Sequence, residues 1–167
     1  MTLKNKWLAV VFGCMAFSAC HIYSFTGASV EGKTINISYI ENTARIVTPA
    51  LSNTLTEKVR NKVLNQTSLS QVNSDKTDYT LKGTVTSYDV SIASVQNLNA
   101  VAKNRLTIVV EFVFTNNINN KNSFTRSYTK FGDFPGDETL QQAEGILIEQ
   151  ISKEIADVIF NDAFVNW

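Results

Sequence analysis

The clearest pattern in the chain is a strand-type alternation over residues 105–115. Its apolar side chains at even positions are Leu106, Ile108, Val110, Phe112 and Phe114. A period of two is typical of a strand that buries one face. A shorter alternation over residues 33–39 puts Ile35, Ile37 and Tyr39 on one side. Both segments predict β-strands with one face in the core.

The segment 79–92 also alternates, but its phase changes in the middle. Apolar side chains stand at odd positions at Leu81 and Val85, and at even positions from Tyr88 onward. One extra residue in the strand, near residues 86–87, would return both sets to the same face. We therefore expect one long strand with a β-bulge.

An asparagine-rich hairpin connection is predicted at residues 116–121, because asparagine tolerates turn conformations. A returning strand follows over 123–131, and the segment 132–137, with its proline and glycine, is expected to break the strand. The odd positions of the returning strand are Ser123, Thr125, Ser127 and Thr129. Its even positions are Phe124, Arg126, Tyr128 and Lys130. The pattern does not decide which of these two sets faces the core.

Two segments have the three-to-four-residue spacing of amphipathic helices. The first, of about 16 residues, is predicted to begin with Thr48 as its cap and Pro49 in its first turn. Its apolar stripe is Leu51, Leu55, Val59 and Val63. The second, of about 20 residues, is predicted to follow Asp137 as its cap. Its stripe is Leu140, Leu147, Ile148, Ile151, Ile155, Val158 and Ile159.

The order strand, helix, several antiparallel strands, helix predicts an α+β fold. The simplest arrangement is a two-layer sandwich, with two helices packed on one face of a mainly antiparallel four-stranded sheet. The other face would then carry Lys82, Thr84, Thr86, Arg105, Thr107, Val109, Glu111, Val113 and Thr115. Such a threonine-rich face suits either a sheet open to water or contact with a polar partner, such as the lumen of a large β-barrel.

Residues 1–19 have the pattern of an export signal, with two early lysines and an apolar run over 7–17. That run is shorter than the roughly 20 residues that span a bilayer as a helix. Ser18 and Ala19 precede Cys20, as in a bacterial lipobox. We expect cleavage before Cys20 and its acylation, for example with palmitate, which leaves residues 20–167 as a single domain. The alternative is an ordinary signal followed by a spare thiol.

The charge balance and the sparse histidine content exclude several function classes. The chain has 15 basic and 15 acidic residues, and loss of the two early lysines leaves a formal charge of −2. A broad nucleic-acid surface needs concentrated positive charge and is not expected. The single histidine, His21, stands beside the predicted anchor, and Asp133, Asp137 and Glu138 suit a solvated loop and helix start. With no zinc spacing, phosphate-binding loop or dinucleotide fingerprint, we expect no enzyme, no metal and no cofactor.

Several short segments, in their order and spacing, resemble the LptE lipoproteins of lipopolysaccharide assembly in the form found in Bacteroidetes-type bacteria. They are Cys20, the following residues 23–27, the strand opening at 104–108 and the chain end at 165–167. The resemblance implies a lipid-anchored protein on the periplasmic side of the outer membrane. It implies a plug inside the LptD β-barrel, which helps the barrel assemble and binds lipopolysaccharide in transit.

Lipopolysaccharide contacts in that family are basic, so the resemblance directs attention to basic side chains on the strands. Charge and strand phase select Lys82, Lys103, Arg105, Arg126 and Lys130. The alternative for each is a charge that only keeps the surface soluble. A second hypothesis for the protein is a lipoprotein that activates a periplasmic cell-wall synthase. The short stretch of about 15 residues between Cys20 and the first strand reaches at most ~50 Å, which favours work close to the anchoring membrane. An enzyme acting on lipids is a third hypothesis, which the absence of a suitable histidine or metal spacing disfavours.

Overall fold

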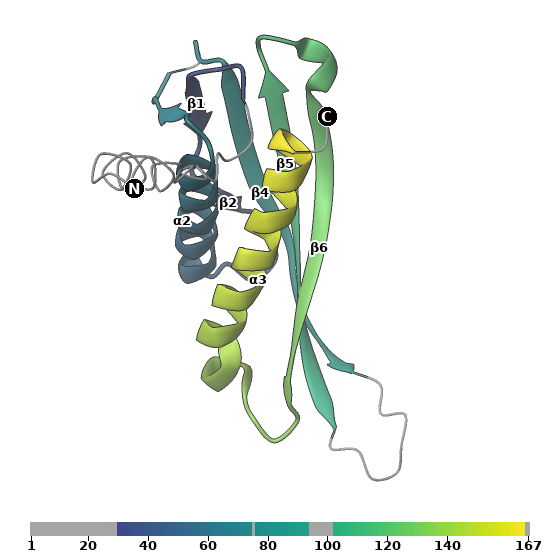
Figure 1. Cartoon of the computed structure of the whole chain (residues 1–167). Helices are drawn as coiled ribbons and strands as arrows, with labels where there is room; N and C mark the ends of the chain where they lie inside the picture. Colours follow the sequence, from purple (N-terminus) through teal and green to yellow (C-terminus); the bar gives the residue numbers. More distant parts are fainter. Residues whose placement is uncertain (1–29, 75, 94–101, 166–167) are drawn as a thin grey trace, which may run out of the picture.

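The computed structural model describes residues 30–74, 76–93 and 102–165 (Figure 1). The elements are β1 (Thr34–Ile37), β2 (Glu41–Asn42), α2 (Pro49–Gln66), β3 (Ser70–Gln71), β4 (Tyr79–Ala93), β5 (Lys103–Asn116), the 3-10 helix η1 (Asn120–Asn122), β6 (Phe124–Pro135) and α3 (Leu140–Phe164). The predicted signal, Cys20 and His21 lie outside the described residues.

The strands form one mixed sheet of six strands. The order is β3-β1-β4-β5-β6, and β2 pairs with β4 beside β1. The pairs β4–β5 and β5–β6 are antiparallel, whereas β1 and β2 pair with β4, and β1 with β3, in parallel. The predicted α+β class is confirmed, but the prediction of a mainly antiparallel sheet of four strands was wrong. Two-residue strands and parallel pairs between distant segments leave little local pattern in a sequence.

The helices α2 and α3 lie side by side on one face of the sheet (Figure 1). The five even positions of β5 that were predicted to be buried are at most 1% exposed, and so are the four stripe positions of α2. Each fully buried aliphatic or aromatic side chain contributes about 1.5–3 kcal/mol relative to an exposed one. This shared core confirms the stripe of α2 and the buried face of β5. Of the predicted α3 stripe, Leu147, Ile148, Ile151, Ile155 and Ile159 are buried, whereas Leu140 and Val158 are only partly buried.

The predicted bulge is present in β4. Val85 pairs with Val110 and Ser87 pairs with Val109, so Thr86 has no partner in the register. Tyr88 consequently returns to the core and is only 2% exposed. The phase change in the sequence was a sound signal for an extra residue.

The far end of β4 extends past the helices, so the two layers are not of equal length. Val90 is 44% exposed and Ile92 is 78% exposed. The carboxylate of Glu144 accepts hydrogen bonds from Tyr88 Oη at 2.5 Å and from Thr48 Oγ1 at 3.4 Å. This contact joins the beginning of α2, the sheet and α3 just before β4 leaves the helix layer. Burial, followed by the bond to Glu144, raises the pKa of Tyr88.

The first strand ends earlier than its alternation predicts. β1 stops at Ile37, and Tyr39 is 52% exposed instead of buried. Ile40 takes the core position, at 1% exposed, and its N–H donates to Thr56 Oγ1 of α2 at 3.0 Å. The turn toward α2 therefore shifts the buried side by one residue.

The predicted start of the first helix is confirmed, because α2 begins at Pro49 with Thr48 at its N-cap position. The Thr48 side chain makes no capping hydrogen bond and turns to α3 instead. The predicted cap of the second helix was wrong. Asp137 lies before the helix, because α3 begins at Leu140 with Thr139 as its N-cap. The Thr139 N–H donates to Gln142 Oε1 at 2.9 Å, which is one half of a capping box. A threonine followed by a glutamine three residues later was the sequence pattern that indicated this helix start.

The returning strand is longer than predicted, because residues 132–135 continue β6. Gly132 pairs with Leu106, and a Cβ at Gly132 would lie 2.6 Å from Leu147 Cδ2. Glycine here lets α3 pack directly onto the strand. Phe134 is also buried, so the core extends to the end of β6.

Asp78 joins the beginning of β1 to the beginning of β4. Its Oδ2 accepts hydrogen bonds from the N–H of Lys33 at 2.8 Å, the N–H of Thr34 at 3.0 Å and Oγ1 of Thr34 at 2.9 Å. These bonds, led by the one from Lys33, hold the pKa of Asp78 below its ordinary value. A single carboxylate thus fixes where the parallel pair starts.

Candidate functional site

The sheet face opposite the helices has no covering layer among the described residues. We call it the open face and define it by five rows of paired side chains. The rows, taken from β4, β5 and β6, are Lys82, Val113 and Thr125; Thr84, Glu111 and Ser127; Ser87, Val109 and Thr129; Asp89, Thr107 and Phe131; and Ser91, Arg105 and Asp133. The predicted threonine-rich face is therefore real, and Ser127, Thr125 and Thr129 extend it.

Hydroxyl groups dominate the open face, and its charges nearly balance. Its acidic side chains, Asp89, Glu111 and Asp133, stand against Lys82 and Arg105, with Lys103 at its end. Two larger apolar side chains are partly exposed on it, Val113 at 39% and Phe131 at 49%. The face is therefore polar and close to neutral, neither a core surface nor a charged one.

Arg105 is engaged within the open face. Its Nε lies 2.6 Å from Asp133 Oδ1 and its Nη2 lies 2.9 Å from Oδ2, a two-point contact. The guanidinium also stacks on the ring of Phe131, 3.8 Å from its centroid. Hydrogen bonding by Arg105 holds the pKa of Asp133 below its ordinary value. Arg105 therefore brings little unbalanced charge to a ligand.

The five predicted lipopolysaccharide residues do not form one group. Lys82, Lys103 and Arg105 lie on the open face, and neither lysine has an ion pair among the described residues. Arg126 and Lys130 lie on the helix side of β6, since they pair with Phe112 and Ile108, which are buried there.

Arg126 is also held by the fold. It forms an ion pair with Asp162 of α3, and Tyr128 Oη donates to the same carboxylate at 2.8 Å. The aromatic side chains at even positions of β6 could have indicated that this set faces the helices. The pairing of Arg105 with Asp133 had no such local signal, because it depends on the register of β5 against β6.

No catalytic or metal centre is evident in the part of the chain that the structure describes. Within it, no group of three or more histidine, cysteine, aspartate or glutamate side chains could hold a metal ion. Asp133, which the sequence placed in a solvated loop, forms an ion pair with Arg105. Among the described helices, none is both long and apolar enough to cross a membrane.

Comparison with known proteins gives one family and several similar folds. The model of the LptE family, described as Lipopolysaccharide-assembly, matches residues 32–163. No curated protein matches the sequence significantly.

Three solved lipoprotein structures illustrate the similarity in fold. A minor lipoprotein from Acinetobacter baumannii has a TM-score of 0.51 and 18% identity, over 82% of this chain and 96% of that chain. The rare lipoprotein B from Shewanella oneidensis has a TM-score of 0.51 and 18% identity, over 77% and 92%. Lipoprotein B from Nitrosomonas europaea has a TM-score of 0.53 and 12% identity, over 78% and 81%. At these identities the similarity concerns the fold alone.

Proposed function

Since the chain belongs to the LptE family of lipopolysaccharide-assembly proteins, we propose that it is an outer-membrane lipoprotein that plugs an LptD-type β-barrel. It helps this barrel assemble and assists lipopolysaccharide transport to the cell surface. Acyl chains on Cys20 anchor it to the periplasmic side of the membrane. The family is one of non-enzymatic lipoproteins, so the chain is not an enzyme.

One observation carries the barrel part of this proposal, the polar and nearly neutral open face. The lumen of a membrane β-barrel is itself polar. Serine and threonine hydroxyls both donate and accept hydrogen bonds, so they suit such a wall without burying unpaired charge. Val113 and Phe131 add apolar contact within the same face.

The lipopolysaccharide part of the proposal uses the basic side chains of the open face. Lys82 and Lys103 are its better candidates, because their ammonium groups have no ion pair among the described residues. Replacing Arg105 by an acidic residue would place two carboxylates side by side with Asp133 and disturb the sheet. Tests of ligand contact should therefore change the lysines first.

The barrel contact can be tested by affinity purification of the tagged protein from outer membranes. We expect a large β-barrel at about one copy per copy of this chain. The Val109→Arg variant puts a long charged side chain at the middle of the open face, so it should reduce barrel recovery at least ~tenfold by steric overlap and unpaired charge. Gln141→Arg, on the exposed side of α3, is the matched control and should retain recovery.

Two results would contradict the assignment. One is equal barrel recovery with the Val109 and Gln141 variants, which would move the contact elsewhere on the molecule. The other is a normal level and heat-modifiable mobility of the barrel after depletion of this protein. Recovery of a periplasmic cell-wall synthase in place of a barrel would support the alternative function.

A further inference from the structure

The outer edge of β4 is paired along only part of its length. β1 and β2 pair with this edge no further than Val85. Over residues 87–93 no described strand pairs with it, although β5 pairs with the opposite edge of β4 as far as Ala93. Figure 1 shows this end of β4 running on beyond the helices. We call the outer edge of residues 87–93 the free edge, and its length is close to the roughly 5–6 residues of an ordinary strand.

The free edge offers backbone groups without partners. The backbone groups of successive residues in a strand point to opposite edges. The carbonyl oxygen of Val85 accepts a hydrogen bond from the N–H of Thr43 at 2.9 Å, so odd positions face this edge before the bulge. The extra residue at the bulge passes that role to even positions. Tyr88, Val90 and Ile92 therefore direct their N–H and C=O groups toward the free edge, where no described residue pairs with them.

Apolar side chains line the helix side of the free edge. Val90 and Ile92 are both exposed there. Val47 lies nearby and is 61% exposed, since the residue after it, Thr48, bonds to the same carboxylate as Tyr88. The exposed apolar surface therefore continues from the strand to the beginning of α2.

Polar side chains line the other side of the free edge, where it borders the open face. These are Ser87, Asp89 and Ser91, and the Ser87 hydroxyl donates a hydrogen bond to Asp89. Asp89 has no ion pair among the described residues. Its neighbour on β5 is Thr107, which is uncharged. A basic side chain on the free side of Asp89 would therefore balance its charge.

The edge formed by β6, on the other side of the sheet, has a different composition. Arg126 and Lys130 stand on its helix side, and Pro135 ends the strand. Inward-pointing charges and proline are features that keep a strand edge from pairing with another chain. Residues 87–93 contain no lysine, arginine or proline. The edge without this protection is therefore the one on β4.

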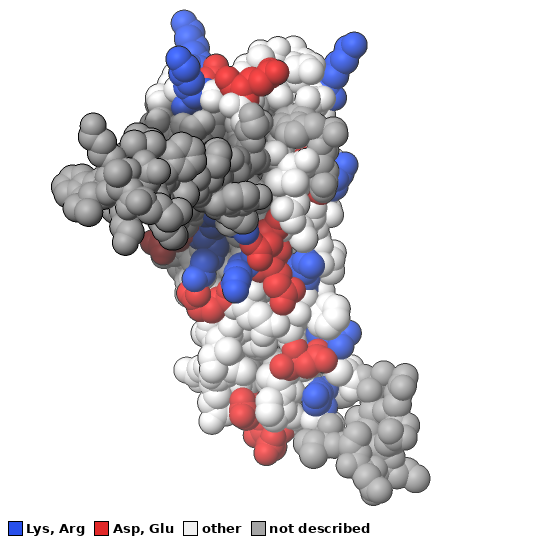
Figure 2. Space-filling model, viewed as in Figure 1, with Lys and Arg blue, Asp and Glu red and all other residues white. Residues whose placement is uncertain are grey.

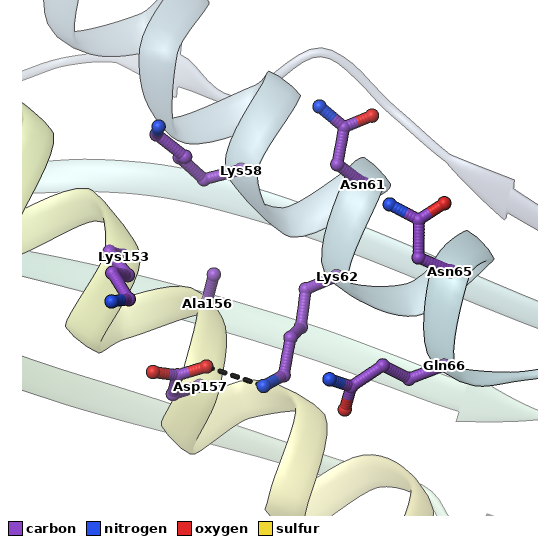
Figure 3. Close-up of a pocket in the computed structure, with 8 residues that line it drawn as sticks. All are labelled: Lys58, Asn61, Lys62, Asn65, Gln66, Lys153, Ala156 and Asp157. Atoms are coloured by element: carbon purple, nitrogen blue, oxygen red, sulfur yellow. Dashed lines mark ion pairs between the residues drawn. The ribbon is translucent and has the colours of Figure 1, made fainter. Parts of the chain in front are cut away.

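The outer side of the helix layer also differs from the free edge. Figure 2 shows basic and acidic side chains gathered over it. Lys58 Nζ lies 2.5 Å from Glu149 Oε2, and Lys62 Nζ lies 2.6 Å from Asp157 Oδ1. Figure 3 shows the second ion pair joining α2 to α3. Because most of these charges are paired within the fold, this surface does not select an apolar partner.

We propose that the free edge binds a β-strand from the polypeptide of the barrel partner. The incoming backbone pairs with Tyr88, Val90 and Ile92, which is recognition by strand addition. Side chains alternate along a strand, so one set contacts the apolar side of the free edge and the other set lies beside Asp89. The partner segment therefore alternates between apolar and polar residues and carries a lysine or arginine next to Asp89.

This proposal rests on the proposed function for the identity of the partner, whereas the pairing chemistry follows from the edge itself. The strands of a closed barrel have no free edge of their own. The incoming strand therefore comes from a loop or terminal segment outside the barrel wall. Because Ser87, Asp89 and Ser91 belong to the open face, the added strand extends the same surface that contacts the barrel.

The first test compares two variants of Val90. Val90→Pro removes the N–H that the incoming strand needs, and it leaves the pairing with β5 intact because that N–H faces outward. Val90→Ala shortens the side chain but keeps the N–H, so it is the matched control. In affinity purification of the tagged full chain from outer membranes, we expect Val90→Pro to lower barrel recovery ~fivefold or more, and Val90→Ala less than ~twofold.

The second test uses the parent chain. Amide hydrogen exchange is measured on the free protein and on the purified barrel complex. We expect the N–H groups of Tyr88, Val90 and Ile92 to exchange at least ~tenfold more slowly in the complex, because strand addition gives them hydrogen-bond partners. A photo-crosslinking residue in place of Ile92 should join the chain to a barrel segment that has the alternating pattern and a basic residue.

Each contrary result has a distinct meaning. Equal recovery with Val90→Pro and Val90→Ala, or unchanged exchange in the complex, would overturn strand addition while the barrel contact through the open face stands. Absence of a barrel with the parent would overturn the proposed function and this occupant together. A dimer of the purified chain that Val90→Pro abolishes would assign the free edge to a second copy instead. If Val90→Pro does not fold, hydrogen exchange on the parent decides.

Discussion

Asp78 connects two segments that are 44 residues apart through three hydrogen bonds to one oxygen. Asp78→Asn removes the negative charge that these donors share, so we expect a loss of about 1 kcal/mol in the free energy of unfolding. That figure is below the ~1.5–3 kcal/mol of a buried bond to a charged group, because this site is partly exposed. Urea denaturation measures it, and Asp137→Asn, at an exposed acid ahead of α3, is the control.

Asp78 also makes the free energy of unfolding depend on pH. The pKa of Asp78 is lower in the folded protein than its ordinary value of 3.8, so the unfolded chain binds the proton more readily. Its stabilisation is therefore complete above that value and is lost as the pH falls through it toward the folded pKa. The difference in unfolding free energy between the parent and Asp78→Asn should shrink from about pH 5 to about pH 3. A difference that stays constant over this range would show that the carboxylate charge is not the cause.

At the scale of elements, the bulge in β4 predicts different losses of stability for two single-residue deletions. Removing Thr86, which has no partner in the register, leaves Val85 and Tyr88 on the buried side and should cost little stability. Removing Thr84 instead moves Val85 to the open face and brings Thr86 into the core. Because this exposes an apolar side chain and buries a hydroxyl, we expect it to cost about 2 kcal/mol more. Equal unfolding midpoints for the two deletion variants would contradict the proposed role of the bulge.

The regular elements could largely be predicted, because their information is local. The alternation of β5, the stripe of α2 and the phase change in β4 each arise from side chains within one segment. The short strands β2 and β3 could not be predicted, since they consist of two residues each and exist only through their partners. Element ends were also difficult, as at Tyr39 and Asp137, where a turn or a cap several residues away decides the boundary.

The candidate sites show which functional information a sequence holds. The threonine-rich open face could be predicted, because alternation within a strand assigns side chains to faces. The ion pair between Arg105 and Asp133 could not, because it depends on the register of β5 against β6.

The arrangement of the sheet also has a consequence for how the chain folds. The strands β4, β5 and β6 follow one another, with Ala93 paired to Lys103 and Phe114 to Phe124, so each hairpin closes a loop of about ten residues. β1 pairs with β4 from Ile35 and Tyr79 to Ile37 and Leu81, which closes a much longer loop that includes α2. Loop-closure entropy disfavours such distant pairs early in folding. We therefore expect the three-stranded meander to form first and the amino-terminal strand, held by Asp78, to dock after it.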